Sequence, residues 1–135
     1  MKAGAGIILC QFMEGQPKFL GLVGPENFQI RNHGTFDIPK GIIEIGEEPW
    51  AAAQRECFEE SGVFVFEEDL ISGPFVYGNL SVWLAKCLHD PTIGPNPYTG
   101  ITEHLGYQWL QPQELLNDSY IYLKPAVRWA IGELC

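Results

Sequence analysis

Basic residues are scarce in this sequence. Its 135 residues include 8 Lys and Arg against 17 Asp and Glu, so the formal net charge is −9. A protein that holds nucleic acid mainly through its surface needs the opposite balance, so bulk nucleic-acid binding is not expected. Phosphate-bearing substrates stay compatible with this charge when divalent cations stand between carboxylate and phosphate.

Paired cysteines are also missing. The chain has 4 Cys, without a CxxC pair and without a histidine at zinc-ligand spacing. This pattern argues against a disulfide scaffold and favours buried free thiols in a reducing compartment. The positions concerned are Cys10, Cys57, Cys87 and Cys135.

Long apolar runs are absent as well, since none approaches the roughly 20 residues of a membrane-spanning helix. The N-terminal stretch MKAGAGIILCQF lacks the length and cleavage site of a signal peptide, and we interpret it as a first strand. No repeat or linker divides the chain, whose composition is 46% hydrophobic and 13% aromatic. We expect one ordered domain over residues 1–135 in a cytoplasmic protein with no membrane association.

Strand formers, turn residues and helix signals alternate along the chain. Pro49 suits the first position of a helix and Gly62 the left-handed residue after its end, which predicts a helix from Pro49 to Ser61. The pattern as a whole predicts an α+β domain, an α/β/α sandwich. The other predicted segments are a hairpin of residues 4–12 and 17–24, a turn and short strand at 29–38, strands at 63–70, 73–79, 80–88 and 103–111, helices at 112–118 and 123–134, and loops at 39–48 and 89–100.

The predicted central helix carries an unusual charge pattern. On a helical wheel Trp50 and Cys57 mark the buried side, while Glu56, Glu59 and Glu60 share another. Like charges at this spacing repel, and the negative end of the helix dipole disfavours them further. A solvated acidic face is the common alternative, but such a face would carry Lys or Arg near its end. We interpret the stripe as a site for hard cations such as Mg²⁺.

The same stretch resembles the Nudix box, G-x5-E-x7-R-E-U-x-E-E-x-G-U, in which U is apolar. All seven fixed identities are present within residues 41–63. The apolar positions hold Cys57 and Val63, and Cys57 is less usual there than Leu, Ala or Ile. On this motif the chain is identified as a member of the Nudix hydrolase family. The fixed positions are Gly41, Glu47, Arg55, Glu56, Glu59, Glu60 and Gly62.

The resemblance implies a Nudix fold with a mixed sheet and a loop–helix–loop catalytic motif. It also implies an enzyme, a pyrophosphohydrolase that uses Mg²⁺ or Mn²⁺ to cleave a nucleoside diphosphate linked to another moiety. A backbone carbonyl at Lys40 or Gly41 would complete the metal ligands. Either Glu59 or Glu60 would orient the attacking water, and these two roles stay open. The expected catalytic residues are Glu47, Arg55, Glu56 and Glu59, with Arg55 paired to Glu47. The expected metal ligands are Gly41, Glu56, Glu59 and Glu60, together with Glu103 from outside the box, for which a solvated loop end is the alternative.

Two segments outside the box resemble diadenosine tetraphosphate (Ap4A) hydrolases. FDIPKG, residues 36–41, is similar to their W-x-P-P-K-G, with Phe36 in the Trp place and Ile38 in the first Pro place. EHLGYQWL, residues 103–110, is similar to E-H-x-x-Y-x-W-L. Together with the box the resemblance covers about half of the chain, and it implies cleavage of Ap4A to ATP and AMP. PKG segments also occur in diphosphoinositol polyphosphate and mRNA-decapping Nudix enzymes.

Four residues are expected to contact the nucleotide. Arg31 and Lys40 flank the loop before the helix and would meet phosphate, Arg31 as a fork and Lys40 as a point charge. Tyr107 would lie near the nucleotide, with core packing as its alternative, and Tyr77 completes the set. The three histidines lack metal-ligand spacing and are interpreted as surface or hydrogen-bonding residues, His104 being the one nearest to a phosphate role.

Two other functions fit the same residues. One is a nucleoside triphosphate or oxidised-nucleotide pyrophosphatase, which uses the same chemistry. The second is a catalytically silent Nudix domain that binds a nucleotide as a sensor, but such domains usually lose box carboxylates and none is lost here. A calcium-binding structural helix fits poorly because no EF-hand spacing is present. The sequence leaves the oligomeric state open.

Overall fold

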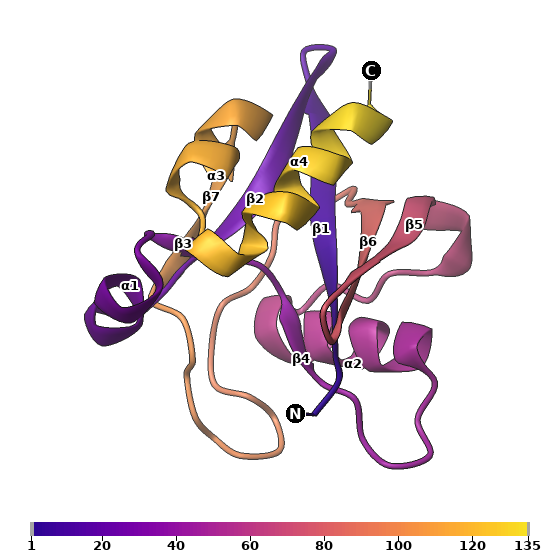
Figure 1. The fold of residues 1–135 in the computed structure, drawn as a ribbon, viewed down its shortest axis with the longest axis vertical. Helices are drawn as coiled ribbons and strands as arrows, with labels where there is room; N and C mark the ends of the chain where they lie inside the picture. The colour runs from indigo at the N-terminus through magenta and orange to yellow at the C-terminus, as the bar shows by residue number, and fades with distance from the viewer. Residues whose placement is uncertain (1, 135) are drawn as a thin grey trace.

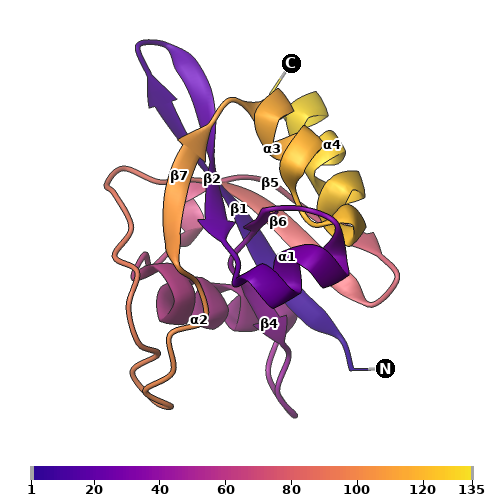
Figure 2. The same ribbon diagram turned by 90° about the vertical axis from the view of Figure 1, so that its left-hand side faces the viewer.

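Seven strands form one mixed sheet with helices on both of its faces (Figures 1 and 2). The computed structural model describes residues 2–134. The strands are β1 (Gly4–Met13), β2 (Gln16–Val23), β3 (Phe36–Asp37), β4 (Lys40–Ile42), β5 (Leu70–Tyr77), β6 (Leu80–Lys86) and β7 (Gly106–Leu110). The helices are α1 (Glu26–Asn32), α2 (Pro49–Ser61), α3 (Pro112–Asp118) and α4 (Lys124–Glu133), with short 3₁₀ helices at Glu67–Asp69 and Ile121–Leu123.

The strand order β3-β2-β1-β6-β5 combines one parallel pair, β1 with β6, with antiparallel neighbours. β1 and β2 pair with each other only near the turn that joins them, where residues 10–13 of β1 lie opposite residues 16–19 of β2. Beyond that point β2 pairs with β3 and β7, and the first residues of β1 pair with β4. The hairpin therefore opens at the end where the chain leads through β3 and β4 into α2.

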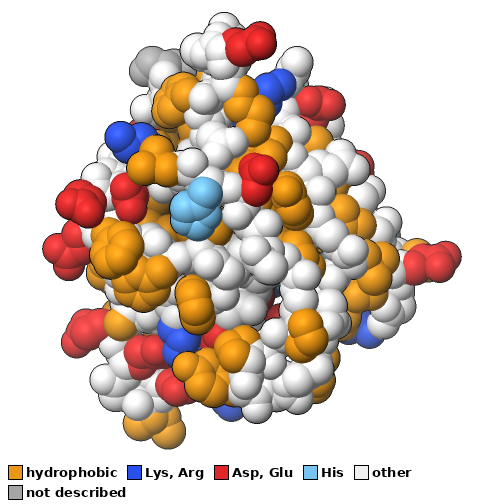
Figure 3. Space-filling view, turned by 180° about the vertical axis from the view of Figure 1, so that it is seen from behind, with side chains coloured by type: hydrophobic (Ala, Val, Ile, Leu, Met, Phe, Trp, Pro, Cys, Tyr) orange, Lys and Arg blue, Asp and Glu red, His pale blue; other side chains and the backbone are white. Residues whose placement is uncertain are grey.

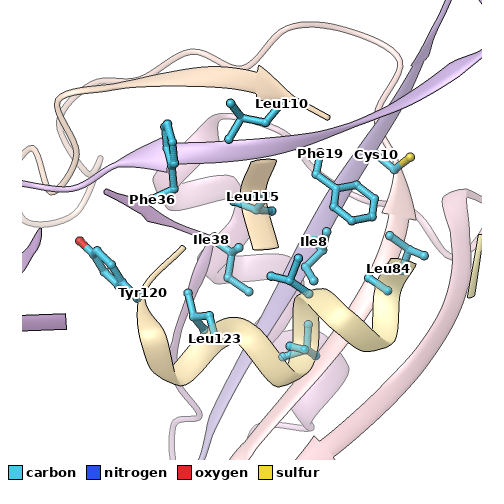
Figure 4. Close-up of a cluster of buried hydrophobic side chains, with 14 residues drawn as sticks. Ile8, Cys10, Phe19, Phe36, Ile38, Leu84, Leu110, Leu115, Tyr120 and Leu123 are labelled. Carbon is cyan, nitrogen blue, oxygen red and sulfur yellow. The ribbon is translucent and has the colours of Figure 1, made fainter. Parts of the chain in front are cut away.

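The sheet buries a separate core on each face. Ile8 and Cys10 of β1 join a cluster with residues of α4, which we call the α4-side cluster. Ile7 and Leu9 point the other way and join residues of α2 in the α2-side cluster, because successive strand residues face opposite sides. Figure 4 shows side chains of the α4-side cluster lying between the yellow ribbon of α4 and the strands of the sheet. The predicted α/β/α sandwich is confirmed.

Helix α2 has the bounds that its end signals predict. Pro49 is its first residue, and Gly62 after its end is left-handed with φ 73°. The Gly62 N–H donates to the carbonyl of Phe58 at 2.9 Å, which closes the last turn. The predicted helices at 112–118 and 123–134 and the strands at 73–79, 80–88 and 103–111 are present too, with some ends shifted by a few residues.

The sequence prediction missed helix α1. None of its 7 residues is buried, so it carries no apolar period that would reveal a helix. Its first turn is fixed by the carbonyl of Pro25, which accepts from the N–H groups of Phe28 and Gln29 at 3.0 Å. His33 ends the helix in the left-handed conformation. The short strand expected in residues 29–38 is present as β3.

The strand predicted at 63–70 is wrong. Residues 63–66 pair with no strand, and a 3₁₀ helix follows before β5 begins at Leu70. Val63 and Val65 are buried in the α2-side cluster, whereas Phe64 and Phe66 are exposed. The alternation that indicated a strand therefore comes from an extended segment that packs one side against α2.

The three described cysteines, Cys10, Cys57 and Cys87, are buried and free, as predicted. Burial raises the pKa of Cys10 to about 11 and that of Cys57 to about 12, so these thiols stay protonated near neutral pH. Cys135 lies outside the described residues.

The surface shows no single dominant apolar face in the view of Figure 3. Apolar side chains gather there in several small groups, and acidic side chains are spread around them. Within residues 2–134, no helix has the length and apolar character needed to cross a membrane.

The close approach of β4 to β1 depends on Gly6. A Cβ at this position would lie 2.8 Å from the carbonyl oxygen of Pro39 and 2.7 Å from Cβ of Lys40. We expect Gly6→Ala to lower the free energy of unfolding by about 1–3 kcal/mol through overpacking, as measured by urea denaturation. Gly132→Ala in α4, where a Cβ meets open space, is the control and should stabilise by roughly 0.5–1 kcal/mol. Equal changes in both variants would contradict this account.

Candidate functional site

Arg55 of α2 joins the loop before the helix to the acidic face of the helix. Its Nε and Nη2 donate to the two carboxylate oxygens of Glu47 at 2.8 and 3.0 Å. Its Nη1 donates to Glu56 at 2.8 Å and to Glu59 at 2.9 Å, and Nη2 also donates to the carbonyl of Ile42 at 3.0 Å. The hydrogen bonds from Arg55 lower the pKa of Glu47. The Arg55–Glu47 pair implied by the family resemblance is thus present.

Gly41 lets β4 lie directly against α2. A Cβ on Gly41 would lie 2.1 Å from Cδ of Glu56, so any side chain there would displace that carboxylate. One residue earlier, the backbone N–H of Lys40 donates to Oε1 of Glu60 at 3.3 Å. The backbone of β4 and the carboxylates of Glu56 and Glu60 therefore meet at one place, which is where the resemblance expects a carbonyl ligand.

Glu60 is a buried residue of the stripe, with 9% of its surface exposed. Burial raises its pKa well above the usual range, and the nearby carboxylates of Asp37, Glu103 and Glu56 raise it further against the opposing charge of Lys40. Burying an acid among other acids is costly unless a cation offsets the charge. The stripe is not a solvated face, and its oxygen donors fit a hard divalent cation.

Glu103 reaches this group from a distant part of the chain. One ligand atom each of Glu60, Glu103 and His104 lies within 4.8 Å of the other two. Glu59 lines the same small hollow together with these three residues. The structure thus brings Glu103 to the helix carboxylates, as the sequence analysis expected, and it adds His104, which sequence reasoning had left as a surface or hydrogen-bonding residue.

A cavity of about 530 Å³ opens beside the carboxylates. The guanidinium carbon of Arg31 lies 5.2 Å from the centre of the Phe28 ring, and both residues come from α1. The ammonium of Lys40 lies 3.2 Å from the Asp37 carboxylate. The residues that line the cavity are Pro25, Phe28, Arg31, Asn32, Asp37, Lys40, Glu60, Ile101, Thr102, Glu103, Tyr120 and Tyr122.

Asp37 is a buried member of this site that sequence reasoning missed. Its carboxylate accepts from Nε2 of His104 at 3.0 Å and from the N–H of Ile38 at 2.8 Å. Burial alone would raise the pKa of Asp37, but the charge of Lys40 and the hydrogen bond with His104 outweigh burial and lower it. In FDIPKG the acid stands between two apolar residues, and strand alternation would place it in solvent. Lys40, three positions later, was the one local signal that the Asp37 carboxylate has a charged partner.

The two tyrosines expected at the nucleotide lie outside this cavity. Tyr107 of β7 packs against the α2-side cluster, which is the core alternative that the sequence left open. Tyr77 donates its hydroxyl hydrogen to the carbonyl of Tyr122 at 2.8 Å and lines a neighbouring hollow with Lys40 and Gly41. A nucleotide contact of Tyr77 or Tyr107 stays a prediction.

A profile of the NUDIX domain matches residues 2–130. The chain belongs to the Nudix family. A "MutT-like protein" of Streptomyces ambofaciens is 29% identical over 84 residues, which cover 62% of this chain and 53% of that protein. This chain therefore spans about half the length of that curated relative.

Solved Nudix structures share the fold over nearly the whole chain. A C. elegans Ap4A hydrolase in a binary complex is 21% identical with a TM-score of 0.71, and the match covers 99% of this chain and 98% of that one. A MutT protein from Methanosarcina mazei Go1 is 18% identical with a TM-score of 0.64, covering 98% of this chain and 94% of that one. At these identities the likeness concerns the fold.

Gly41→Ala tests whether Glu56 takes part in binding a divalent cation. The new Cβ should displace the Glu56 carboxylate while costing about 1 kcal/mol or less, because the flexible end of one side chain gives way. Millimolar Mg²⁺ should raise the unfolding temperature of the wild type more than monovalent salt at matched ionic strength. The Mg²⁺ effect should be smaller in Gly41→Ala.

Gly106→Ala is the matched control, since a Cβ there meets open space, and it should respond to Mg²⁺ like the wild type. An undiminished Mg²⁺ shift in Gly41→Ala would remove Glu56 from the metal ligands. Equal shifts from both salts in the wild type would leave only charge screening.

Proposed function

We propose that this protein is a divalent-metal-dependent pyrophosphohydrolase that cleaves a nucleoside diphosphate linked to another moiety, with a dinucleoside polyphosphate such as Ap4A as the favoured substrate. The observation that carries the proposal is the meeting of Glu60 and Glu103 on the wall of one cavity with Arg31. The carboxylates that would hold a metal ion and the Arg31 guanidinium that would hold a phosphate thus face the same cavity. This combination suits a polyphosphate ester better than an uncharged ligand.

The residues of the site would have different roles in the reaction. A bound Mg²⁺ or Mn²⁺ would neutralise the diphosphate and lower the pKa of the attacking water. Glu56, Glu60 and Glu103 would hold the cation with a carbonyl of the Lys40–Gly41 segment. Glu59 would orient the water and accept its proton as phosphorus is attacked. Because Arg55 bonds Glu59 and Glu56 at once, it would keep their carboxylates in place during the reaction.

Arg31 is favoured over Lys40 as the main phosphate contact. Asp37 already offsets the charge of Lys40 at 3.2 Å, whereas no carboxylate of residues 2–134 lies within 4.0 Å of Arg31. A guanidinium also presents two parallel donors to a phosphate. Phe28 beside it would offer its ring to a nucleobase, since aromatic faces stack on bases with little preference among them. Helix α1 would therefore bind the part of the substrate away from the metal.

The dinucleoside polyphosphate preference rests on FDIPKG and EHLGYQWL together with the site. The cavity of about 530 Å³ has room for a nucleotide and continues past the carboxylates to α1. A triphosphate or oxidised-nucleotide pyrophosphatase is the second candidate, because it would use the same residues and the same chemistry. A location in the cytoplasm and the organisation of residues 1–135 as one domain stay predictions.

Glu59→Gln tests the role of the helix carboxylates in the reaction. The amide keeps the shape but cannot accept a proton, so kcat should fall on the order of 100-fold or more at saturating Mg²⁺. Stability should change by about 1 kcal/mol or less, because the amide oxygen still accepts from Arg55. Steady-state kinetics and thermal unfolding measure the two effects. Glu114→Gln, at an exposed position in α3, is the control, and wild-type turnover in Glu59→Gln would remove this residue from catalysis.

A substrate panel tests the proposed substrate. With Mg²⁺, Ap4A should give ATP and AMP rather than two ADP, because the enzyme would attack off-centre with one adenosine held at α1. Chromatography of the products, repeated in ¹⁸O-labelled water, shows which product carries the new oxygen. Two ADP would contradict the proposed off-centre attack, and slow Ap4A cleavage beside fast triphosphate cleavage would favour the second candidate. No turnover on any nucleotide, with a nucleotide still raising the unfolding temperature, would indicate a sensor.

A further inference from the structure

The carboxylate of Glu103 lies in the site but accepts no hydrogen bond from the described part of the chain, residues 2–134. It belongs to the segment of residues 87–105 between β6 and β7, and its side chain is exposed. Within residues 2–134 no hydrogen bond or ion pair holds its carboxylate, yet the carboxylate lies within 4.8 Å of ligand atoms of Glu60 and His104. Something else must therefore hold this part of the chain over α2.

The next residue supplies the attachment. His104 is buried, with 6% of its surface exposed, and its Nε2 lies 3.0 Å from Oδ2 of Asp37. The N–H of Leu105 donates to the carbonyl of Val23 at 2.8 Å and continues the attachment into the sheet. Because a histidine donates from Nε2 in the charged ring and in one neutral tautomer, the bond does not require a charged ring.

We propose that Asp37 is a positioning residue that holds Glu103 over Glu60 through His104. The other carboxylate oxygen of Asp37, Oδ1, lies 3.2 Å from the ammonium of Lys40. The backbone N–H of Lys40 in turn donates to Glu60 at 3.3 Å. One buried carboxylate therefore fixes the two segments that flank Glu60. The inference rests on the proposed function in that Glu103 is taken as a metal ligand.

Stability alone does not explain a charged group at this position. Asp37, the last residue of β3, stands between buried Phe36 and Ile38 and is itself buried, with 7% of its surface exposed, so its charge is held out of water. Replacing a buried ion pair or triad by well-packed apolar residues is often neutral or stabilising. The Asp37–Lys40–His104 group, which we call the clamp, is therefore assigned to alignment of the site.

Mn²⁺ affinity, measured by the EPR signal of free Mn²⁺, tests the clamp without any substrate. Glu103→Gln should weaken Mn²⁺ binding about tenfold, and Asp37→Asn should weaken it by a similar factor, because outer partners of metal ligands affect affinity on the order of 10-fold or more. Because Asp37 also holds Lys40 beside Glu60, the double variant Asp37→Asn/Glu103→Gln should lose less affinity than the product of the two single losses. Such non-additivity is expected only if Asp37 acts through Glu103.

Asp90→Asn is the matched control. Asp90 attaches the other end of the same segment, since it accepts from Nε1 of Trp109 at 3.0 Å, but nothing links it to Glu103. This variant should bind Mn²⁺ within about twofold of the wild type, and circular dichroism should show all variants folded. If Asp37→Asn fails to fold, His104→Leu breaks the same clamp while leaving the Asp37–Lys40 pair, and it should show the same loss.

Three results would overturn the clamp while leaving metal binding intact. They are an additive double variant, equal losses in Asp37→Asn and Asp90→Asn, and a Glu103→Gln variant with unchanged affinity. A wild-type protein that binds no Mn²⁺ would instead overturn the proposed function and the clamp together.

Discussion

The guanidinium of Arg55 contacts the carboxylates of Glu47, Glu56 and Glu59 at 2.8–2.9 Å, and the arrangement of the acidic site depends on these contacts. Without this cation, three acids from the loop and the helix would repel one another across a half-buried space. The forked geometry is essential because a lysine presents a single point charge and cannot bind Glu47 through two bonds while reaching two further acids. The loop thus becomes a fixed part of the helix surface.

Local signals in the sequence predicted the parts of the site that lie close together along the chain. The box residues fall at fixed spacing, and Pro49 and Gly62 mark the ends of α2, so the helix and its acidic face could be derived directly. Helix α1 gave no such signal because its side chains are not buried. The segment 63–66 misled the prediction because alternating burial arises against a helix as well as within a sheet.

Contacts between distant residues explain what the sequence could not show. Asp37 and His104 are 67 positions apart, and each is an ordinary polar residue until the fold places one beside the other. The same holds for Arg31, whose place on the cavity wall follows from a helix that was not predicted. The motif residues therefore indicate which chemistry is available, while residues outside the motif determine how the ligands are aligned and what else the cavity admits.

The tip of the segment between β6 and β7 forms a closed unit of its own. The N–H of Asn96 donates to the carbonyl of Ile101 at 2.8 Å, and the side chain of Asn96 accepts from the N–H groups of Tyr98 and Thr99. Residues 97–100 project beyond this hydrogen bond, and 79% of the surface of Tyr98 is exposed. Because doubling a loop costs only about 0.6 kcal/mol, this tip offers a grafting point for new recognition segments beside the carboxylates. Protein engineering could thereby alter ligand preference while leaving Glu103 in place.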